Sequence, residues 1–208
     1  MAQASTLAVL GAGALGAVMA TRLGDTGHQV RLWNRTEERA RAVADGAARV
    51  TAVSAVGDAV SGASVVITVL RDGDAVAEVM SGAIDRFDTD AVWVQASTVG
   101  PQSASALAAL ARDQGVGYLD APVSGSTAPA RQGKLVWLAA GTEGALASAR
   151  PVLDDLGSFR APRWDGNRGQ RRQASGQRLD GCLDGRHERC PCAVRRSRRR
   201  PRDVRPRA

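Results

Sequence analysis

Three glycines with the spacing Gly-x-Gly-x-x-Gly give this sequence a candidate phosphate-binding loop. They belong to the run Gly11-Ala12-Gly13-Ala14-Leu15-Gly16, which lies between an apolar strand-like stretch (residues 7–10) and a helical pattern (residues 17–23). In such a unit the first glycine makes the tight turn, the second lets the backbone approach a pyrophosphate, and the third lets helix and strand pack closely. The helix N-terminus offers free N–H donors. We predict that this loop binds a dinucleotide; the alternative is a turn that binds nothing.

The three residues after the second predicted strand bear on which dinucleotide is bound. A site for NAD carries Asp or Glu there, which accepts hydrogen bonds from the ribose 2′-OH. This sequence has Asn34-Arg35-Thr36 instead. No carboxylate is present here to repel the 2′-phosphate of NADP. The guanidinium of Arg35 can bind that phosphate, and the Asn34 and Thr36 side chains can donate hydrogen bonds to it. The sequence predicts NADP as cofactor, with NAD as the alternative. In the other interpretation, Arg35 is an ordinary surface arginine.

Apolar runs that alternate with amphipathic windows must position these residues. Strands are predicted at Thr6–Leu10, Gln29–Trp33, Ser64–Leu70, Ala91–Ala96, Gly117–Leu119 and Leu135–Ala139. Helices are predicted at about residues 14–24, 36–45, 73–80, 101–114 and 143–156. The strands are continuous apolar runs, as expected for parallel strands that are buried on both faces of a sheet. The predicted fold is therefore α/β, with a doubly wound, mainly parallel sheet of the Rossmann type.

The net charge of +7 is distributed unevenly along the chain. Residues 1–163 carry 14 Lys and Arg against 16 Asp and Glu, a net charge of −2, whereas residues 164–208 carry 14 Arg against five acids, a net charge of +9. We expect residues 1–163 to form the dinucleotide-binding domain. Residues 164–208 are expected to be an Arg-rich disordered tail, because they have too few apolar side chains to offset the entropy of ordering.

Cysteine placement and hydropathy bear on the compartment. No stretch approaches the roughly 18 apolar residues of a membrane span, and the N-terminus lacks the basic and apolar segments of a signal peptide. The three cysteines, Cys182, Cys190 and Cys192, all lie in the tail, so the body has no disulfide framework. These features predict a soluble cytoplasmic protein that does not contact a membrane.

Further motifs beyond the glycine loop are shared with one family of enzymes. They are Met19-Ala20, Gly27-His28, Trp33-Asn34-Arg35-Thr36, Ser97-Thr98-Val99, and Asp120-Ala121-Pro122-Val123-Ser124-Gly125-Ser126 followed by Ala130, Gly133 and Leu135. On these motifs, residues 5–163 resemble the β-hydroxyacid dehydrogenases, which include 3-hydroxyisobutyrate, tartronate-semialdehyde and 6-phosphogluconate dehydrogenases. The block at residues 120–126 is the most specific, because generic Rossmann architecture does not require it.

The resemblance implies an oxidoreductase that oxidises a short β-hydroxyacid, or reduces the corresponding semialdehyde, with NADP. It places Thr98 on the nicotinamide side of the cofactor, and Leu70 and Arg71 in the loop over the adenosine half. It also implies that Ser124-Gly125-Ser126 binds the substrate carboxylate through a hydroxyl and successive N–H groups, unless Ser124 only satisfies its own turn. The family has glycine where this chain has Ser126, which should narrow the accessible backbone conformations. A homodimer is expected only if the family's C-terminal helical domain is present.

Two side chains that could take part in proton transfer receive other interpretations. His28 is interpreted as a surface residue at a helix–strand turn rather than a catalyst. In the family a lysine on the helix after the Rossmann domain accepts the hydroxyl proton, with an asparagine four residues later on the same helix face. The only lysine here, Lys134, matches a variable position of the family. No catalytic residue is therefore predicted in this chain.

A shift of reading frame explains the missing lysine. Within residues 166–178, a one-base shift converts the codons of Gln173 and Ala174 into Lys or Arg. It converts Gln177, followed by a CGN codon for Arg178, into Asn or Ser. These are the family's two helix residues at the family's spacing. We infer a frameshift near residue 165, so that the C-terminal helical domain is missing and the tail is out of frame.

Other functions for the tail are less consistent with its residues. The arginines of residues 195–202 could contact nucleic-acid phosphates, but no aromatic residues interleave with them for base stacking. Cys182, His187, Cys190 and Cys192 could bind zinc, but their spacing matches none of the usual patterns. No metal is predicted, and nucleic acid is not expected as a partner. For the whole chain, the alternative to an oxidoreductase domain is a module that binds cofactor, or nothing, without turnover.

Overall fold

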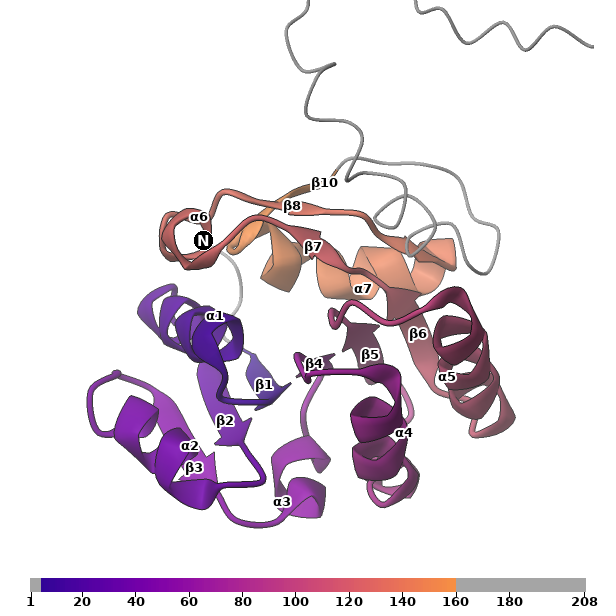
Figure 1. Cartoon of the computed structure of the whole chain (residues 1–208), viewed down its shortest axis with the longest axis horizontal. Helices are drawn as coiled ribbons and strands as arrows, with labels where there is room; N and C mark the ends of the chain where they lie inside the picture. Colours follow the sequence, from indigo (N-terminus) through magenta and orange to yellow (C-terminus); the bar gives the residue numbers. More distant parts are fainter. Residues whose placement is uncertain (1–4, 160–208) are drawn as a thin grey trace, which may run out of the picture. The chain divides into compact units, whose positions relative to one another are not determined.

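Strands and helices alternate along residues 5–159, which are the residues that this computed structural model of the 208-residue chain describes (Figure 1). The strands are β1 (Thr6–Leu10), β2 (Gln29–Trp33), β3 (Val50–Val53), β4 (Val65–Thr68), β5 (Val92–Gln95), β6 (Gly117–Asp120), β7 (Val123–Ser124), β8 (Leu135–Trp137), β9 (Ala140–Gly141) and β10 (Gly157–Phe159). The helices are α1 (Ala14–Asp25), α2 (Glu37–Ala44), α3 (Val56–Val60), α4 (Gly73–Ser81), the 3₁₀ turn η1 (Ile84–Arg86), α5 (Pro101–Asp113), α6 (Thr127–Arg131) and α7 (Glu143–Asp154).

The main sheet has the order β3-β2-β1-β4-β5-β6-β9. All neighbours from β3 to β6 are parallel, and β9 pairs antiparallel with β6. This arrangement confirms the predicted doubly wound, mainly parallel α/β sheet. The strand order reverses between β1 and β4, and ligands of such sheets bind at the carboxyl ends of the strands at that reversal. The glycine loop begins there, directly after β1.

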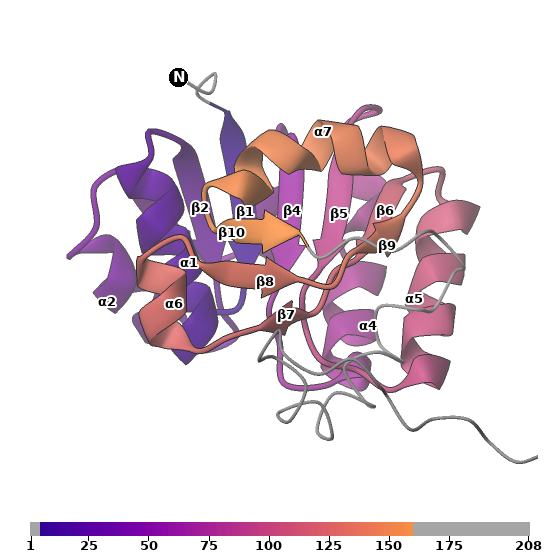
Figure 2. The same cartoon turned by 90° about the horizontal axis from the view of Figure 1, so that it is seen from above.

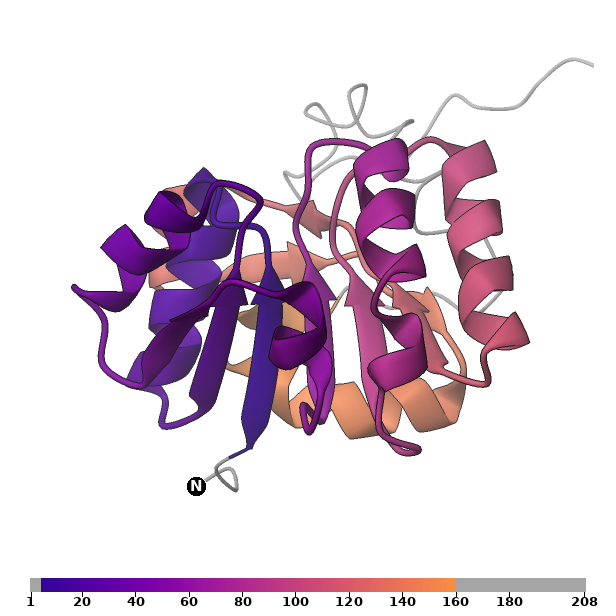
Figure 3. The same cartoon turned by 90° about the horizontal axis from the view of Figure 1, so that it is seen from below.

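Alternate residues of the central strands enter two separate apolar cores. In β1, Leu7 and Val9 belong to the core that includes side chains of α1, α2, α6 and α7, whereas Ala8 and Leu10 belong to the core that includes side chains of α3, α4 and α5. Figure 3 shows α4 and α5 on one face of the sheet and α7 on the other. Because both faces are covered, successive strand positions are apolar, which explains the continuous runs in the sequence.

The predicted strands and helices are all present, and β1 and β2 have the predicted bounds. Seven short elements were not predicted: β3, β7, β9, β10, α3, α6 and η1. Each has five residues or fewer. Such segments are too short to display the period of a helix or strand, so sequence pattern alone does not reveal them.

One strand lies in a different sheet from the one expected. The stretch Leu135–Ala139 was predicted to be one strand of the doubly wound sheet. Residues Leu135–Trp137 instead form β8 of a separate three-stranded sheet, in which β8 pairs with β10 and β7 (Figure 2). The chain returns to the main sheet only at β9. This small sheet carries the predicted substrate-binding block at one edge, in β7 and the loop after it.

His28 is buried, so its interpretation as a surface residue was wrong. Its side chain is only 2% exposed. The ring Nδ1 accepts a hydrogen bond from the backbone N–H of Ser5 at 3.3 Å, and Nε2 lies 3.0 Å from Oδ2 of Asp155. Because Nδ1 is an acceptor, the neutral ring carries its proton on Nε2 and donates it to Asp155. His28 thus ties the start of β2 to the end of α7.

Replacing His28 by alanine is expected to destabilise the fold without touching the cofactor site. The change removes both hydrogen bonds of a buried ring, to the partly buried residues Ser5 and Asp155, which should lower the free energy of unfolding by about 1–3 kcal/mol. Urea denaturation followed by circular dichroism measures the effect. Gln29→Ala is the matched control, because Gln29 is the exposed neighbour and surface changes stay within about 0.5 kcal/mol. Equal urea midpoints for His28→Ala and the native protein would contradict the structural role.

The remaining expectations of the sequence concern the membrane and the tail. Within residues 5–159, no helix combines the length and apolarity that a membrane crossing requires. The predicted disordered tail (residues 164–208), its cysteines and the frame-shifted segment lie outside the described residues, and so does the predicted domain boundary at residue 163.

Candidate functional site

The glycine loop occupies the crevice between β1 and β4, and glycine alone fits at two of its positions. Gly11 has a φ of +120°, and a Cβ there would overlap the carbonyl oxygen of Val69. A Cβ on Gly16 would overlap the carbonyl oxygen of Gly11. The loop, the end of β4 and α1 can therefore approach one another this closely only without side chains. These are the turn and packing roles that the spacing predicted for the first and third glycines.

Gly13 lies in a different environment, because a Cβ there would meet nothing within 4 Å. It is exposed and forms the N-cap of α1, whose first turn has neither a side-chain cap nor an acidic residue. The first-turn N–H groups of a helix have no acceptor within the helix, and the helix dipole favours an anion there. A bare, open backbone at this helix end therefore fits the diphosphate of a dinucleotide.

The side chain of Asn34 holds the glycine loop in place through hydrogen bonds. Its Oδ1 accepts a hydrogen bond from the backbone N–H of Ala12 at 3.0 Å, and its Nδ2 donates to the carbonyl oxygen of Thr36 at 2.8 Å. The side chain thus connects the loop after β1 to the loop after β2. The sequence suggested Asn34 as a donor to a 2′-phosphate. Its bonds in the structure show that it positions the two loops, and its contact with a 2′-phosphate stays a prediction.

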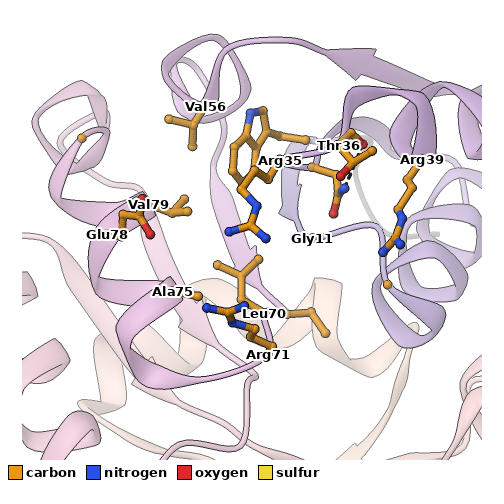
Figure 4. A pocket seen from close by; sticks show the side chains of 15 residues that line it. Gly11, Arg35, Thr36, Arg39, Val56, Leu70, Arg71, Ala75, Glu78 and Val79 are labelled. Atoms are coloured by element: carbon orange, nitrogen blue, oxygen red, sulfur yellow. Dashed lines mark hydrogen bonds between the residues drawn. The ribbon is translucent and has the colours of Figure 1, made fainter.

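A cavity of about 440 Å³ lies beside the glycine loop, at the carboxyl ends of β1, β2 and β4 (Figure 4). It is lined by Gly11, Gly13, Trp33, Asn34, Arg35, Thr36, Arg39, Val56, Val69, Leu70, Arg71, Ala75, Glu78, Val79 and Gly82. The structure therefore brings together seven of the predicted cofactor residues from three separate loops. Thr98 and the Ser124–Ser126 block do not line this cavity.

Three arginines surround the cavity. Arg35 and Arg39 come from the loop after β2 and the start of α2, and Arg71 comes from the loop after β4. Figure 4 shows the guanidinium of Arg35 projecting into the cavity and Arg71 on the wall formed by the β4 loop. Glu78 is the only carboxylate among the lining residues. The cavity is thus cationic on the side where the ribose of a dinucleotide would lie.

Arg39 is a candidate site residue that the sequence did not reveal. Its backbone N–H donates to the carbonyl oxygen of Thr36, the N-cap of α2, at 3.1 Å, so it belongs to the first turn of that helix. The only indication in the sequence was its position four residues after Arg35, which places the two arginines about one helical turn apart. In isolation, however, this arginine resembles the other charged residues of α2.

Apolar side chains form the rest of the cavity wall. They are Trp33, Val56, Val69, Leu70, Ala75 and Val79. The indole of Trp33 is fixed in place, because its Nε1 donates to the carbonyl oxygen of Ser54 at 3.1 Å. Cofactor sites combine such apolar surfaces with a few polar groups that set orientation. A flat aromatic base fits this wall, with the arginines near its sugar.

Asp72 anchors the loop that carries Arg71. Its side chain caps α4 by accepting from the backbone N–H of Ala75 at 2.9 Å, and its Oδ2 lies 2.8 Å from Nε of Arg71. The backbone hydrogen bond from Ala75, with the charge of Arg71, holds the pKa of this carboxyl below its usual value. Asp72 therefore stays ionised near neutral pH and keeps the loop in register with the helix.

The predicted nicotinamide contact, Thr98, lies on the neighbouring loop after β5. Its side chain is exposed. The residue before it, Ser97, is buried, and its Oγ accepts a hydrogen bond from the backbone N–H of Leu70 at 2.8 Å. The loops that carry Leu70 and Thr98 are therefore directly connected. The contact of Thr98 with a cofactor remains a prediction.

The Ser124–Ser126 block forms an exposed turn between β7 and α6. Gly125 has a φ of +134°, where a side chain would be strained, and a Cβ there would lie 3.0 Å from Leu135. Ser126 has φ −114° and ψ −170°, an extended conformation that any residue adopts. Serine at this position therefore causes no backbone strain where the family has glycine. Whether the turn binds a carboxylate remains a prediction.

Lys134 and Tyr118 are two titratable side chains outside the cavity. Lys134 is exposed and its Nζ donates to Oε1 of Gln132 at 3.0 Å, outside the residues that line the cavity. Tyr118 is buried against Trp93, and burial, together with the charge of Asp120, raises its pKa well above the ordinary value. It therefore stays protonated near neutral pH. Within residues 5–159, no group of three potential metal ligands is present.

Comparison with known proteins places this geometry in a family. The sequence pattern described as the NAD binding domain of 6-phosphogluconate dehydrogenase matches residues 6–166 of this chain. The chain belongs to this family. The match includes the glycine loop, the loops that line the cavity and the small second sheet. The family relationship and the Rossmann-type fold that the sequence motifs predicted are therefore confirmed.

Two curated relatives and one solved structure illustrate the relationship. The NAD-dependent L-serine dehydrogenase of Pseudomonas aeruginosa is 34% identical over 154 residues, which are 73% of this chain and 51% of that protein. The 3-sulfolactaldehyde reductase of Escherichia coli is 33% identical over 157 residues, 74% of this chain and 52% of that protein. The structure of Mycobacterium tuberculosis 3-hydroxyisobutyrate dehydrogenase with L-serine superposes with a TM-score of 0.79 at 29% identity, over 85% of this chain and 60% of that one.

The chain spans about half the length of the curated relatives that it matches. The family match ends at residue 166. This is the segment in which the sequence suggested a change of reading frame.

Proposed function

We propose that this domain binds NADP(H) in the cavity beside the glycine loop, with NAD(H) as a weaker ligand. The observation that carries the proposal is the charge distribution: Arg35, Arg39 and Arg71 line the cavity, and residues 34–36, directly after β2, contain no carboxylate for a ribose 2′-OH. A guanidinium binds a phosphate through charge-assisted hydrogen bonds, whereas a carboxylate in the same place would repel a 2′-phosphate. One relative is named as NAD-dependent, so cofactor preference has to be measured for this chain.

Each part of the cofactor has a candidate binding surface. The diphosphate would lie against Gly13 and the first turn of α1, the adenine against the apolar wall, and the 2′-phosphate between the arginines. The bound nicotinamide would supply or accept the hydride of an alcohol–carbonyl interconversion. The chain's own residues hold the adenosine end and, through the β5 loop, limit where the nicotinamide can lie.

For the whole protein we propose the oxidation of a short β-hydroxyacid, or the reverse reduction of the semialdehyde. The names of the relatives support this class, because they include a dehydrogenase of L-serine and one of 3-hydroxyisobutyrate. The exposed turn at Ser124–Ser126 is the proposed binding site of the substrate carboxylate. Its serine hydroxyls and the positive φ of Gly125 resemble the features of an anion-binding nest. The printed 208-residue chain is proposed to bind the cofactor without turning substrate over, because its only lysine, Lys134, is an exposed residue bonded to Gln132 and matches a variable position of the family.

Binding of 2′,5′-ADP and 5′-AMP to the full chain tests the cofactor proposal. The two ligands share adenosine and a 5′-phosphate and differ in the 2′-phosphate. Each charge-assisted hydrogen bond to that phosphate should contribute about 1.5–3 kcal/mol. We therefore expect 2′,5′-ADP to bind at least about tenfold more tightly in a calorimetric titration. Equal affinities would contradict the proposed 2′-phosphate site. If neither ligand shows saturable binding, the cofactor site itself is contradicted.

A further inference from the structure

A cluster of buried polar side chains lies at the carboxyl ends of β4 and β5, beneath the cofactor loops. Thr68 and Gln95 are fully buried at the ends of otherwise apolar strands, and Ser97, in the loop after β5, is 3% exposed. Burying such groups is costly unless each finds a hydrogen-bond partner. All three side chains have partners here. The cluster therefore forms a connected network rather than a packing defect.

Gln95 is the centre of this network. Its Oε1 accepts from the backbone N–H of Ser97 at 2.7 Å, and its Nε2 donates to the carbonyl oxygen of the same residue at 2.8 Å. One side-chain amide thus satisfies both backbone groups of Ser97, immediately before Thr98. The two bonds also assign the orientation of the amide, since the reversed group would place donor against donor. The two peptide groups on either side of Ser97, the second of which leads into Thr98, are therefore each bonded to Gln95.

Ser97 extends the network to the neighbouring loop. Its Oγ accepts from the backbone N–H of Leu70 at 2.8 Å and donates to the carbonyl oxygen of Thr68 at 3.3 Å. Leu70 and Arg71 line the cavity proposed for the adenosine end of the cofactor. Gln95 and Ser97 together therefore connect the loop after β4 with the loop after β5.

We infer that Gln95 is a positioning residue, which acts through Ser97 to hold the Leu70–Arg71 loop and the Thr98 loop at the separation that one dinucleotide requires. This inference rests on the proposed cofactor site. A ligand that contacts both loops gains affinity when the loops are held in place before it binds, because less ordering has to occur on binding. A ligand that contacts only the adenosine end has nothing to gain from that fixed separation.

The comparison of NADPH with 2′,5′-ADP separates positioning from simple structural support. In Gln95→Leu, which keeps most of the volume but has no hydrogen-bonding group, NADPH should bind about tenfold more weakly. Affinity for 2′,5′-ADP should change by less than about twofold. Trp93→Phe is the matched control: Trp93 is equally buried, and its Nε1 donates to Oγ1 of Thr68 at 3.0 Å in the same network, but it has no bond to Ser97 among those described. That variant should lose stability and keep both affinities.

The experiment uses calorimetric titration of the full-length native chain and both variants, at a temperature where circular dichroism shows all three folded. If Gln95→Leu does not fold, Ser97→Ala replaces it, because that change keeps the amide and removes the acceptor for Leu70. An equal loss of affinity for both ligands would overturn the inference, since Gln95 would then support only the adenosine end or the fold. Unchanged NADPH affinity would overturn it as well. Failure of the native chain to bind 2′,5′-ADP would instead contradict the proposed cofactor site.

Discussion

Restoring the reading frame near residue 165 is expected to raise NADP-linked turnover of a β-hydroxyacid by about 10²–10⁴-fold, the usual contribution of a positioned general base. Hydride removal from an alcohol also requires a group that takes the hydroxyl proton. In the chain as printed, the single lysine is exposed and bonded to Gln132. A one-base correction gives Lys or Arg at position 173 and Asn or Ser at position 177, one helical turn apart, and the family's pair is Lys and Asn.

The measurement is NADPH formation by the printed and the corrected chains with a panel of short β-hydroxyacids that includes L-serine and 3-hydroxyisobutyrate. A corrected chain with alanine in place of the restored lysine is the control, because it adds the same downstream sequence without the base. That control should remain as inactive as the printed chain. Substantial turnover by the printed chain would show that another group accepts the proton. Genomic DNA that reads through residues 160–178 in an intact frame would remove the genetic part of the proposal.

Arg35→Ala is expected to weaken NADPH binding by about 1.5–3 kcal/mol, which corresponds to roughly 10- to 150-fold in Kd. The affinity for NADH should change little, because the lost guanidinium has no 2′-phosphate partner in that ligand. Arg41→Ala is the matched control. Arg41 lies on the adjoining helix α2, pairs with Glu37 at 2.7 Å and does not line the cavity, so its removal subtracts the same charge from the same region. A parallel loss in both variants would indicate a general charge effect.

The sequence predicted the phosphate loop and the central strands well, for identifiable reasons. β1 is an almost continuous apolar run that ends at Gly11, and β2 alternates polar with apolar residues before Asn34, so the length of each strand is visible in the pattern. The glycine loop has three positions with distinct steric requirements, and the structure bears out the first and third through the overlaps at Gly11 and Gly16. Such local constraints are visible in sequence because they involve neighbouring residues.

Features that depend on distant residues were not predictable in the same way. His28 resembles a surface residue until its partner, Asp155, is known, and that residue is 127 positions away. β3 has only four residues and follows Arg49, which has a φ of 61°, so neither its length nor its entry resembles a regular strand. The polar cluster around Gln95 lies within an apolar run, where a single amide gives no sign of its partners.

The candidate site likewise has a part that the sequence predicted and a part that it did not. The sequence identified Arg35 and Arg71 on two loops, and the structure places them around one cavity with Arg39, which was not predicted. Thr98 and Ser124 lie outside that cavity, on loops after β5 and in β7. Their roles follow from the family resemblance and remain to be tested.

Titration of the full 208-residue chain with NADPH and with NADH tests the central claim most directly. The arginines around the cavity and the absence of an acidic residue at positions 34–36 predict saturable binding of both cofactors, with NADPH bound at least about tenfold more tightly, or roughly 1.4 kcal/mol. Equal affinity for the two cofactors would contradict the assignment of Arg35 to a 2′-phosphate. No binding of either would contradict the cofactor site as a whole.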